Sequence, residues 1–120
     1  MTVKECYDAM GADYEDVAGR LRTDERIRKF VLKVLNDSSY ALLCSSLEER
    51  NMPEAFRAAH TLKGISQNLS LTKLYESSHE MAELLRNRQE YGADIEPLIE
   101  RVKEDYTMTV DCIQKLASEG

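Results

Sequence analysis

Four residues near the middle of the chain have the types and the spacing to do chemistry together. His60, Lys63, Gly64 and Gln67 follow an i, i+3, i+4, i+7 pattern, which places them on one patch of a helix. A neutral imidazole is a competent nucleophile near pH 7, because the reference pKa of histidine is about 6.5. Its nitrogen can form a covalent bond to phosphorus, and Lys63 would bring positive charge to the phosphoryl oxygens. We therefore interpret His60 as a candidate phosphoryl acceptor.

Two neighbours of His60 are unusual for an ordinary solvent-facing helix surface. Gly64 costs about 1 kcal/mol relative to alanine in a helix interior, and close approach by another molecule is one reason to keep it. Phe56, one turn before His60, is expected to be exposed on the same side, with Arg57 next to it. An exposed aromatic ring beside a polar centre indicates a docking surface for a partner. The spacing alone also allows a solvated histidine without any chemical role.

The segment that carries this patch is predicted to form a helix from Pro53 to about Asn68, since proline is tolerated in the first helical turn. On a helical wheel, the apolar residues gather opposite His60 and form the expected buried side: Ala55, Ala58, Leu62, Ile65 and Leu69.

Helical periodicity covers almost all of the chain, and strand signals are absent. Gly11 should end a first short helix and Thr23 should cap a later one. The short connections predict antiparallel neighbours. We predict a single all-α domain over residues 1–120, with a helical cap over residues 1–22 and an antiparallel up-down four-helix bundle over residues 23–118. The expected helices cover residues 3–10, 14–21, 24–35, 40–51, 53–68, 71–89 and 95–116.

Composition narrows the function. The chain has 120 residues, a net charge of −6 and three cysteines at long spacings. The acidic balance argues against nucleic acid or an anionic membrane as a partner, because both need a basic surface. The cysteines fit reduced thiols, and neither a membrane-length apolar run nor a signal peptide is seen, so we expect a cytoplasmic protein. A glycine-rich phosphate loop and a nucleotide motif are also missing, which predicts that the chain is not an enzyme and does not phosphorylate itself.

The run Phe56-Arg57-Ala58-Ala59-His60-Thr61-Leu62-Lys63-Gly64, followed by Asn68 and Leu69, resembles the signature of histidine-containing phosphotransfer (HPt) domains of bacterial phosphorelays. The resemblance is good from Phe56 to about Arg86. It implies a four-helix bundle in which His60 is phosphorylated at Nε2, Lys63 stabilises the phosphoryl group and Gly64 makes room for an incoming receiver domain. Gln67 is a further polar neighbour.

The same resemblance implies the partners. They are response-regulator receiver domains, together with a hybrid or separate histidine kinase, and the carrier is expected to be a monomer. It needs no cofactor of its own, because the receiver brings the Mg²⁺ and the carboxylate.

Several positions depart from the family pattern. Ile65 replaces a residue that is often small, and Ser70 stands where many members have glycine. Ala82 occupies a position that often holds Glu or Gln to bind the imidazole, so the orientation of His60 must come from elsewhere, with Glu83 or water as candidates. His79, the other histidine, is expected to be a solvated or edge residue.

Two other interpretations remain open. The segment 72–85 also resembles the phosphotransfer domain of chemotaxis histidine kinases, which has a histidine at the place of His79, although Ala82 argues against this assignment. The chain could instead be a helical adaptor that binds a partner through the Phe56 surface without covalent chemistry.

Overall fold

The regular structure is entirely helical in the computed structural model, which describes residues 1–119. The prediction of an all-α chain is confirmed. Within those residues, no helix is both long enough and apolar enough to cross a membrane. The elements are α1 (Val3–Met10), α2 (Tyr14–Leu21), α3 (Asp24–Leu32), the short 3₁₀ helix η1 (Lys33–Asn36), α4 (Ser39–Glu48), α5 (Met52–Asn68), α6 (Thr72–Leu85) and α7 (Ile95–Glu119).

The helix ends follow local capping chemistry. Gly11 ends α1 with a left-handed φ of 64°, and the Thr23 side chain caps α3 by accepting a hydrogen bond from the Arg26 amide, both as predicted. The expected helix 24–35 is wrong at its end, because the chain tightens into η1 after Leu32. The Asp37 carboxylate then accepts a hydrogen bond of 2.9 Å from the Ser39 amide, which helps to start α4 in a new direction.

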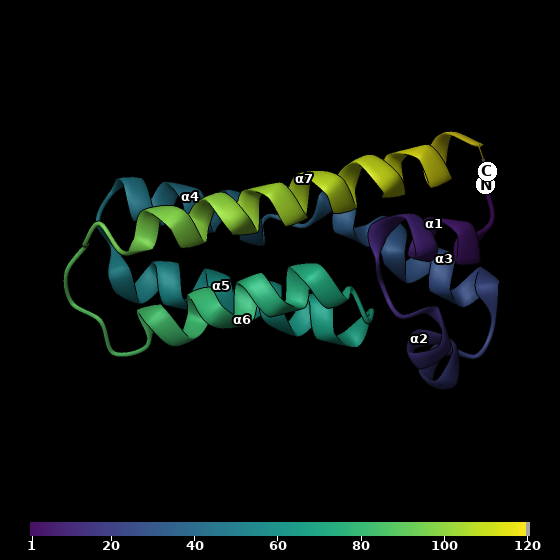
Figure 1. The fold of residues 1–120 in the computed structure, drawn as a ribbon, viewed down its shortest axis with the longest axis horizontal. Coiled ribbons are helices and arrows are strands. Elements are labelled where there is room, and N and C mark those ends of the chain that lie inside the picture. The colour runs from purple at the N-terminus through teal and green to yellow at the C-terminus, as the bar shows by residue number, and fades with distance from the viewer. Residues whose placement is uncertain (120) are drawn as a thin grey trace.

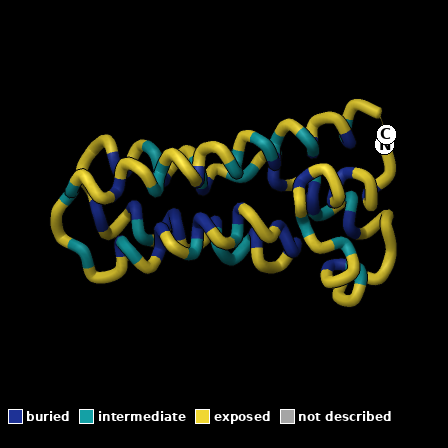
Figure 2. Tube along the Cα trace, in the orientation of Figure 1, coloured by how far each residue is buried: buried dark blue, intermediate teal, exposed yellow. Residues whose placement is uncertain are grey.

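The helices form an elongated body with two parts (Figure 1). Helix α7 runs along most of its length, and α5 packs against both α4 and α6, while α6 also packs against α7. Helices α1, α2 and α3 gather at one end of the body, where α1 and α3 pack against α7 and the N-terminal ammonium of Met1 pairs with Glu119. The buried sides of the helices face one another along the whole body (Figure 2), so one continuous apolar core holds α5 in place.

The N-terminal helices hold the C-terminal end of α5. The buried Tyr7 hydroxyl donates to the Leu69 carbonyl at 2.7 Å, and burial raises the pKa of this tyrosine. The Arg20 guanidinium donates to the carbonyls of Gln67 and Asn68 at 3.2 and 2.9 Å, and also to the Ser70 hydroxyl. These carbonyls lie at the end of α5, where intrahelical donors run out. Residues more than 45 positions away therefore complete the helix that carries His60.

Ser70 adopts a left-handed backbone conformation with a φ of 57°. This explains why a glycine would suit the position. The Ser70 hydroxyl donates to the Asp16 carboxylate at 2.7 Å and accepts from Arg20, so the side chain compensates for the backbone cost.

We expect Arg20→Ala to lower the free energy of unfolding by about 1–2 kcal/mol, because the helix-end carbonyls lose a charged donor that is partly exposed. Urea denaturation followed by circular dichroism measures the change. Arg57→Ala is the matched control, since Arg57 pairs only with exposed Glu54 and should change stability by less than about 0.5 kcal/mol. An equal effect of the two substitutions would contradict the capping role of Arg20.

Candidate functional site

Helix α5 presents His60 to solvent from a rigid element. The Asn51 side chain caps the helix by accepting from the Glu54 amide at 3.2 Å, and Pro53 lies in the first turn. His60, Gln67 and Arg57 are exposed, while Lys63 and Gly64 are half-buried on the flanks of the same surface. The opposite side of the helix is buried and anchors it to the core: Ala55, Ala58, Ala59, Leu62, Ser66 and Leu69.

Comparison of this buried side with the prediction shows one difference. Four of the five apolar residues assigned to it are buried, but Ile65 is only half-buried, because it lies at the edge of α5 beside a surface hollow. Met52, Ala59 and Ser66 are also buried.

Phe56 is not the exposed aromatic that the sequence predicted. It is half-buried and packs against the core cluster. Its ring centroid lies 5.9 Å from that of His60, with the planes tilted by 30°. The guanidinium of Arg86, the residue that follows α6, lies 5.2 Å from the centroid of the Phe56 ring. Phe56 therefore supports the imidazole from one turn below, and Arg86 is a neighbour that sequence reasoning missed.

The Lys63 ammonium forms no ion pair within residues 1–119. Lys63 interacts electrostatically with the carboxylate of Glu83 on α6. A hydrogen bond from Arg86 holds the pKa of Glu83 below its usual range, and the charges of His79 and Lys63 add to this. Glu83 thus stays ionised and paired with Arg86 at 2.9 Å. The Lys63 cation is left available to an incoming anion.

Glu83 does not orient the imidazole in this structure, since its carboxylate pairs with Arg86 and the described part of the chain offers His60 no hydrogen bond. Ala82 is fully buried and has no polar group to offer. The His60 ring instead lies against the Phe56 ring, and this contact restricts its position.

Gly64 opens a space beside His60. A Cβ atom added at this position would meet no atom within 4 Å. The chain itself therefore does not require glycine here, either for packing or for an unusual backbone conformation. Packing within the chain therefore does not explain why position 64 holds glycine, which costs about 1 kcal/mol of helix stability relative to alanine.

His79 lies on α6 and is less accessible than His60. It is half-buried and stacks on Tyr75, with ring centroids 5.7 Å apart and planes at 13°. Its Nδ1 atom is buried and has no hydrogen-bond partner among residues 1–119. Such packing is typical of a residue at the edge of the core, which was one of the two expectations for this position, and it leaves His79 less exposed than His60.

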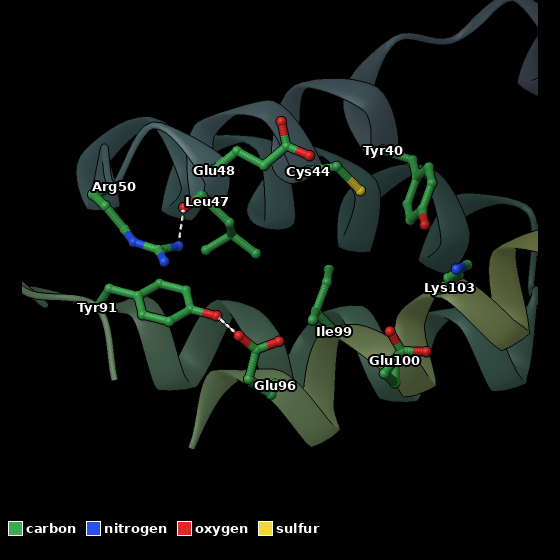
Figure 3. Close-up of a pocket in the computed structure, with 10 residues that line it drawn as sticks. All are labelled: Tyr40, Cys44, Leu47, Glu48, Arg50, Tyr91, Glu96, Ile99, Glu100 and Lys103. Carbon is green, nitrogen blue, oxygen red and sulfur yellow. Dashed lines mark hydrogen bonds between the residues drawn. The ribbon is translucent and has the colours of Figure 1, made fainter. Parts of the chain in front are cut away.

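A hollow lies between α4 and α7 (Figure 3). At one end Tyr40 borders it and stacks on Tyr106 at a centroid distance of 4.1 Å, and at the other the Arg50 guanidinium lies 3.6 Å from the Tyr91 ring centroid. None of the residues that line it belongs to α5, so it is separate from the candidate site. The lining consists of Tyr40, Cys44, Leu47, Glu48, Arg50, Tyr91, Glu96, Ile99, Glu100 and Lys103.

In a comparison with known protein families, residues 33–112 match the family described as Hpt domain. The matched region extends from the start of η1 into the C-terminal half of α7 and includes all of α5 and α6. It leaves α1, α2 and α3 outside. Neither the search of curated proteins nor the search of solved structures returned a match.

Proposed function

Because this chain belongs to the Hpt domain family, we propose that it is a phosphorelay carrier in which His60 exchanges a phosphoryl group with the aspartate of receiver domains. Hpt domains act in phosphotransfer within phosphorelay signalling. The observation that carries the assignment is the exposed imidazole of His60 on a rigid helix, flanked by the unpaired Lys63 cation and the open space at Gly64.

The chemistry asks little of the acceptor. The lone pair of the imidazole Nε2 attacks the phosphorus atom of the receiver's acyl phosphate. The N–P bond forms as the bond between phosphorus and the aspartate side-chain oxygen breaks. The electron pair of the broken bond stays on that oxygen, and the receiver's carboxylate is regenerated. The Nδ1 proton remains on the ring until solvent accepts it. Such transfers depend mainly on positioning and electrostatics, and Lys63 supplies charge on the acceptor side.

The surface around His60 gives each predicted residue a role. Phe56 supports the imidazole ring, Gly64 allows the receiver to approach, and Gln67 and Arg57 lie exposed one to two turns away as polar contacts for it. The carrier needs no cofactor of its own. Mg²⁺ and the reactive carboxylate come with the receiver.

We also infer that α4, α5, α6 and α7 make up the antiparallel four-helix bundle of an Hpt domain. The packing of α5 between α4 and α6, and of α6 on α7, supports this arrangement. In this proposal the protein is a monomeric carrier in the cytoplasm. It receives the phosphoryl group through a hybrid or separate histidine kinase and exchanges it with several receivers in turn.

Transfer from a receiver tests the proposal. The protein is mixed with receiver domains from the same organism that have been phosphorylated with radiolabelled acetyl phosphate and Mg²⁺. We expect the label to appear on the carrier as an acid-labile, base-stable phosphate within seconds to minutes. Failure of every phosphorylated receiver to label the chain would overturn the proposal, and labelling only by an ATP-loaded chemotaxis kinase would assign it to that pathway instead.

Lys63→Gln should slow transfer from a phosphorylated receiver by roughly 10- to 100-fold, because a charged hydrogen bond to the phosphoryl group is worth about 1.5–3 kcal/mol. Lys63→Arg keeps the charge and should recover most of the rate. Rapid-quench measurement of kcat/KM distinguishes the variants, with Lys103→Gln on α7 as the control. A Lys63→Gln rate equal to that of the control would exclude a role for the ammonium group.

A further inference from the structure

Three side chains lie one after another between the end of α6 and the imidazole of His60. The Arg86 guanidinium donates a hydrogen bond of 2.9 Å to the Glu83 carboxylate. The guanidinium carbon lies 5.2 Å from the centroid of the Phe56 ring, and that centroid lies 5.9 Å from the centroid of the His60 ring. We call these three side chains the Glu83–Arg86–Phe56 row. The row connects α6 to the candidate nucleophile on α5.

Arg86 is held at both its backbone and its guanidinium. Its backbone forms the C-cap of α6, where its amide donates to the Glu83 carbonyl. Its guanidinium binds the carboxylate of the same glutamate, and this hydrogen bond lowers the pKa of Glu83, so the carboxylate is ionised at neutral pH. Both side chains are about half exposed, so the pair adds little to stability. What the pair provides is a defined position for the guanidinium.

Phe56 has space beside it, and Arg86 borders that space. The ring packs against the core, but it also borders a surface hollow whose lining includes Leu85 and Arg86. Arg57 and Arg88 line the same hollow, yet in the described part of the chain the guanidinium that lies over the ring is that of Arg86. A planar guanidinium can donate from its edge while its face lies against an aromatic ring. Without it, the Phe56 ring would be free to rotate into the hollow.

The position of the Phe56 ring matters because little else holds His60. The imidazole is exposed, and residues 1–119 offer it no hydrogen bond. An exposed side chain otherwise moves among several rotamers. Transfer within a docked complex requires the attacking nitrogen to lie about 3–3.5 Å from the phosphorus atom and to point at it, so the rate depends on how often the ring adopts that orientation. A residue that fixes Phe56 therefore acts on the reaction without touching the phosphoryl group.

We propose that Arg86 is a positioning residue for phosphoryl transfer, which Glu83 anchors and which acts on His60 through the Phe56 ring. The inference rests on the proposed carrier function. It concerns how the imidazole is held and not whether His60 is the acceptor.

The test compares Arg86→Met, which keeps the length of the side chain but removes the guanidinium, with Arg86→Lys, which keeps the positive charge. Arg101→Met is the matched control, because Arg101 also pairs with a glutamate of α6, Glu80, and the two pairs are exposed to nearly the same extent. The donor is a phosphorylated receiver domain that labels the wild type. Circular dichroism and urea denaturation check the fold of each variant.

We expect Arg86→Met to lower kcat for transfer about three- to tenfold and to leave KM within about twofold of wild type, because the complex forms but the imidazole is oriented less often. Arg86→Lys should recover part of the rate, since an ammonium can lie over an aromatic ring but lacks the planar contact. Arg101→Met should behave like wild type. A rise in KM with an unchanged kcat would make Arg86 a docking contact and overturn the inference.

The NMR signals of the His60 side chain give a readout that needs no receiver. The Phe56 ring shifts the resonances of the imidazole carbon-bound protons, so Phe56→Leu defines their values without that ring. At the alkaline plateau of the titration, we expect Arg86→Met to move these resonances at least about halfway toward the Phe56→Leu values, while the signals of His79 stay in place. Identical His60 resonances in Arg86→Met and Arg101→Met would contradict the inference.

A double-mutant cycle shows whether Arg86 acts through Phe56. Phe56→Leu alone should lower kcat by about tenfold, and adding Arg86→Met should change kcat by less than about a further twofold, because the ring that Arg86 holds is then absent. Full additivity of the two substitutions would mean that Arg86 contacts the phosphoryl group or the receiver directly, and the inference would be wrong.

The outcomes separate this inference from the proposed function. If receivers label the wild type, and Arg86→Met equals the Arg101→Met control in both kcat and the His60 signals, the row does not position His60 and the carrier function stands. If no receiver labels the wild type, the carrier function fails, and the His60 signals alone decide whether the row holds the imidazole.

Discussion

His60→Gln should reduce transfer from a phosphorylated receiver by at least about 10³-fold, because the substitution removes the nucleophile itself. Glutamine keeps a polar side chain at an exposed helix position, so the fold should be unaffected. The measurement is label transferred per minute at equal protein concentration, with circular dichroism to show that the helical content is retained.

His79→Gln is the matched control, since these are the two histidines of the chain. His79 is half-buried and its ring stacks on Tyr75, so it should be a poorer acceptor for an external donor than the exposed His60. We expect its replacement to leave the transfer rate within a few-fold of wild type. A labelled His60→Gln together with an unlabelled His79→Gln would move the acceptor to α6 and contradict the site described above.

Gly64→Ala should have opposite effects on stability and on transfer. The free protein should become more stable by about 1 kcal/mol, because alanine is the better helix former and its Cβ meets no atom within 4 Å. Transfer should fall roughly 5- to 100-fold, since a methyl group at a close interface costs about 1–3 kcal/mol in crowding. Urea denaturation and rapid-quench transfer measure the two effects on the same sample.

Gly19→Ala separates these two effects. Gly19 lies in α2, and a Cβ there also meets nothing within 4 Å. Its replacement should stabilise the protein similarly and leave transfer unchanged. Equal transfer rates for Gly64→Ala and wild type would show that the open space at Gly64 is not used by a docking partner.

The position of the candidate site was predictable because it depends on local periodicity. The spacing of His60, Lys63 and Gly64 fixes one side of a helix, and the apolar residues opposite fix the side that must be buried. The predicted helix 53–68 ends at Asn68 as in the structure and begins one residue late, since α5 starts at Met52.

The surroundings of His60 depend on contacts between helices, and sequence spacing does not determine them. Phe56 was expected to be exposed, but α6 brings Arg86 over its ring. The cap on the end of α5 comes from Arg20, 47 residues before the Gln67 carbonyl that it binds. The break after Leu32 was missed because the apolar spacing continues through Leu35 while the backbone tightens into η1.

The resemblance to the family did not identify the group that orients His60, and the structure excludes two candidates. Ala82 is buried and cannot form a hydrogen bond, and the Glu83 carboxylate pairs with Arg86 instead. The Phe56 ring is the neighbour that remains. Among residues 1–119, neither imidazole nitrogen of His60 has a hydrogen-bond partner, which suits a carrier whose incoming receiver completes the site.

Localisation of the phosphoryl group on the wild-type chain tests the central claim most directly. The protein is labelled by a phosphorylated receiver, digested under neutral or basic conditions, and the phosphopeptide is fragmented in a mass spectrometer. We predict a single phosphoryl group on His60, within the peptide that also contains Lys63 and Gly64. A phosphoryl group on His79 or on a carboxylate, or a stable complex with the receiver without covalent transfer, would contradict the account.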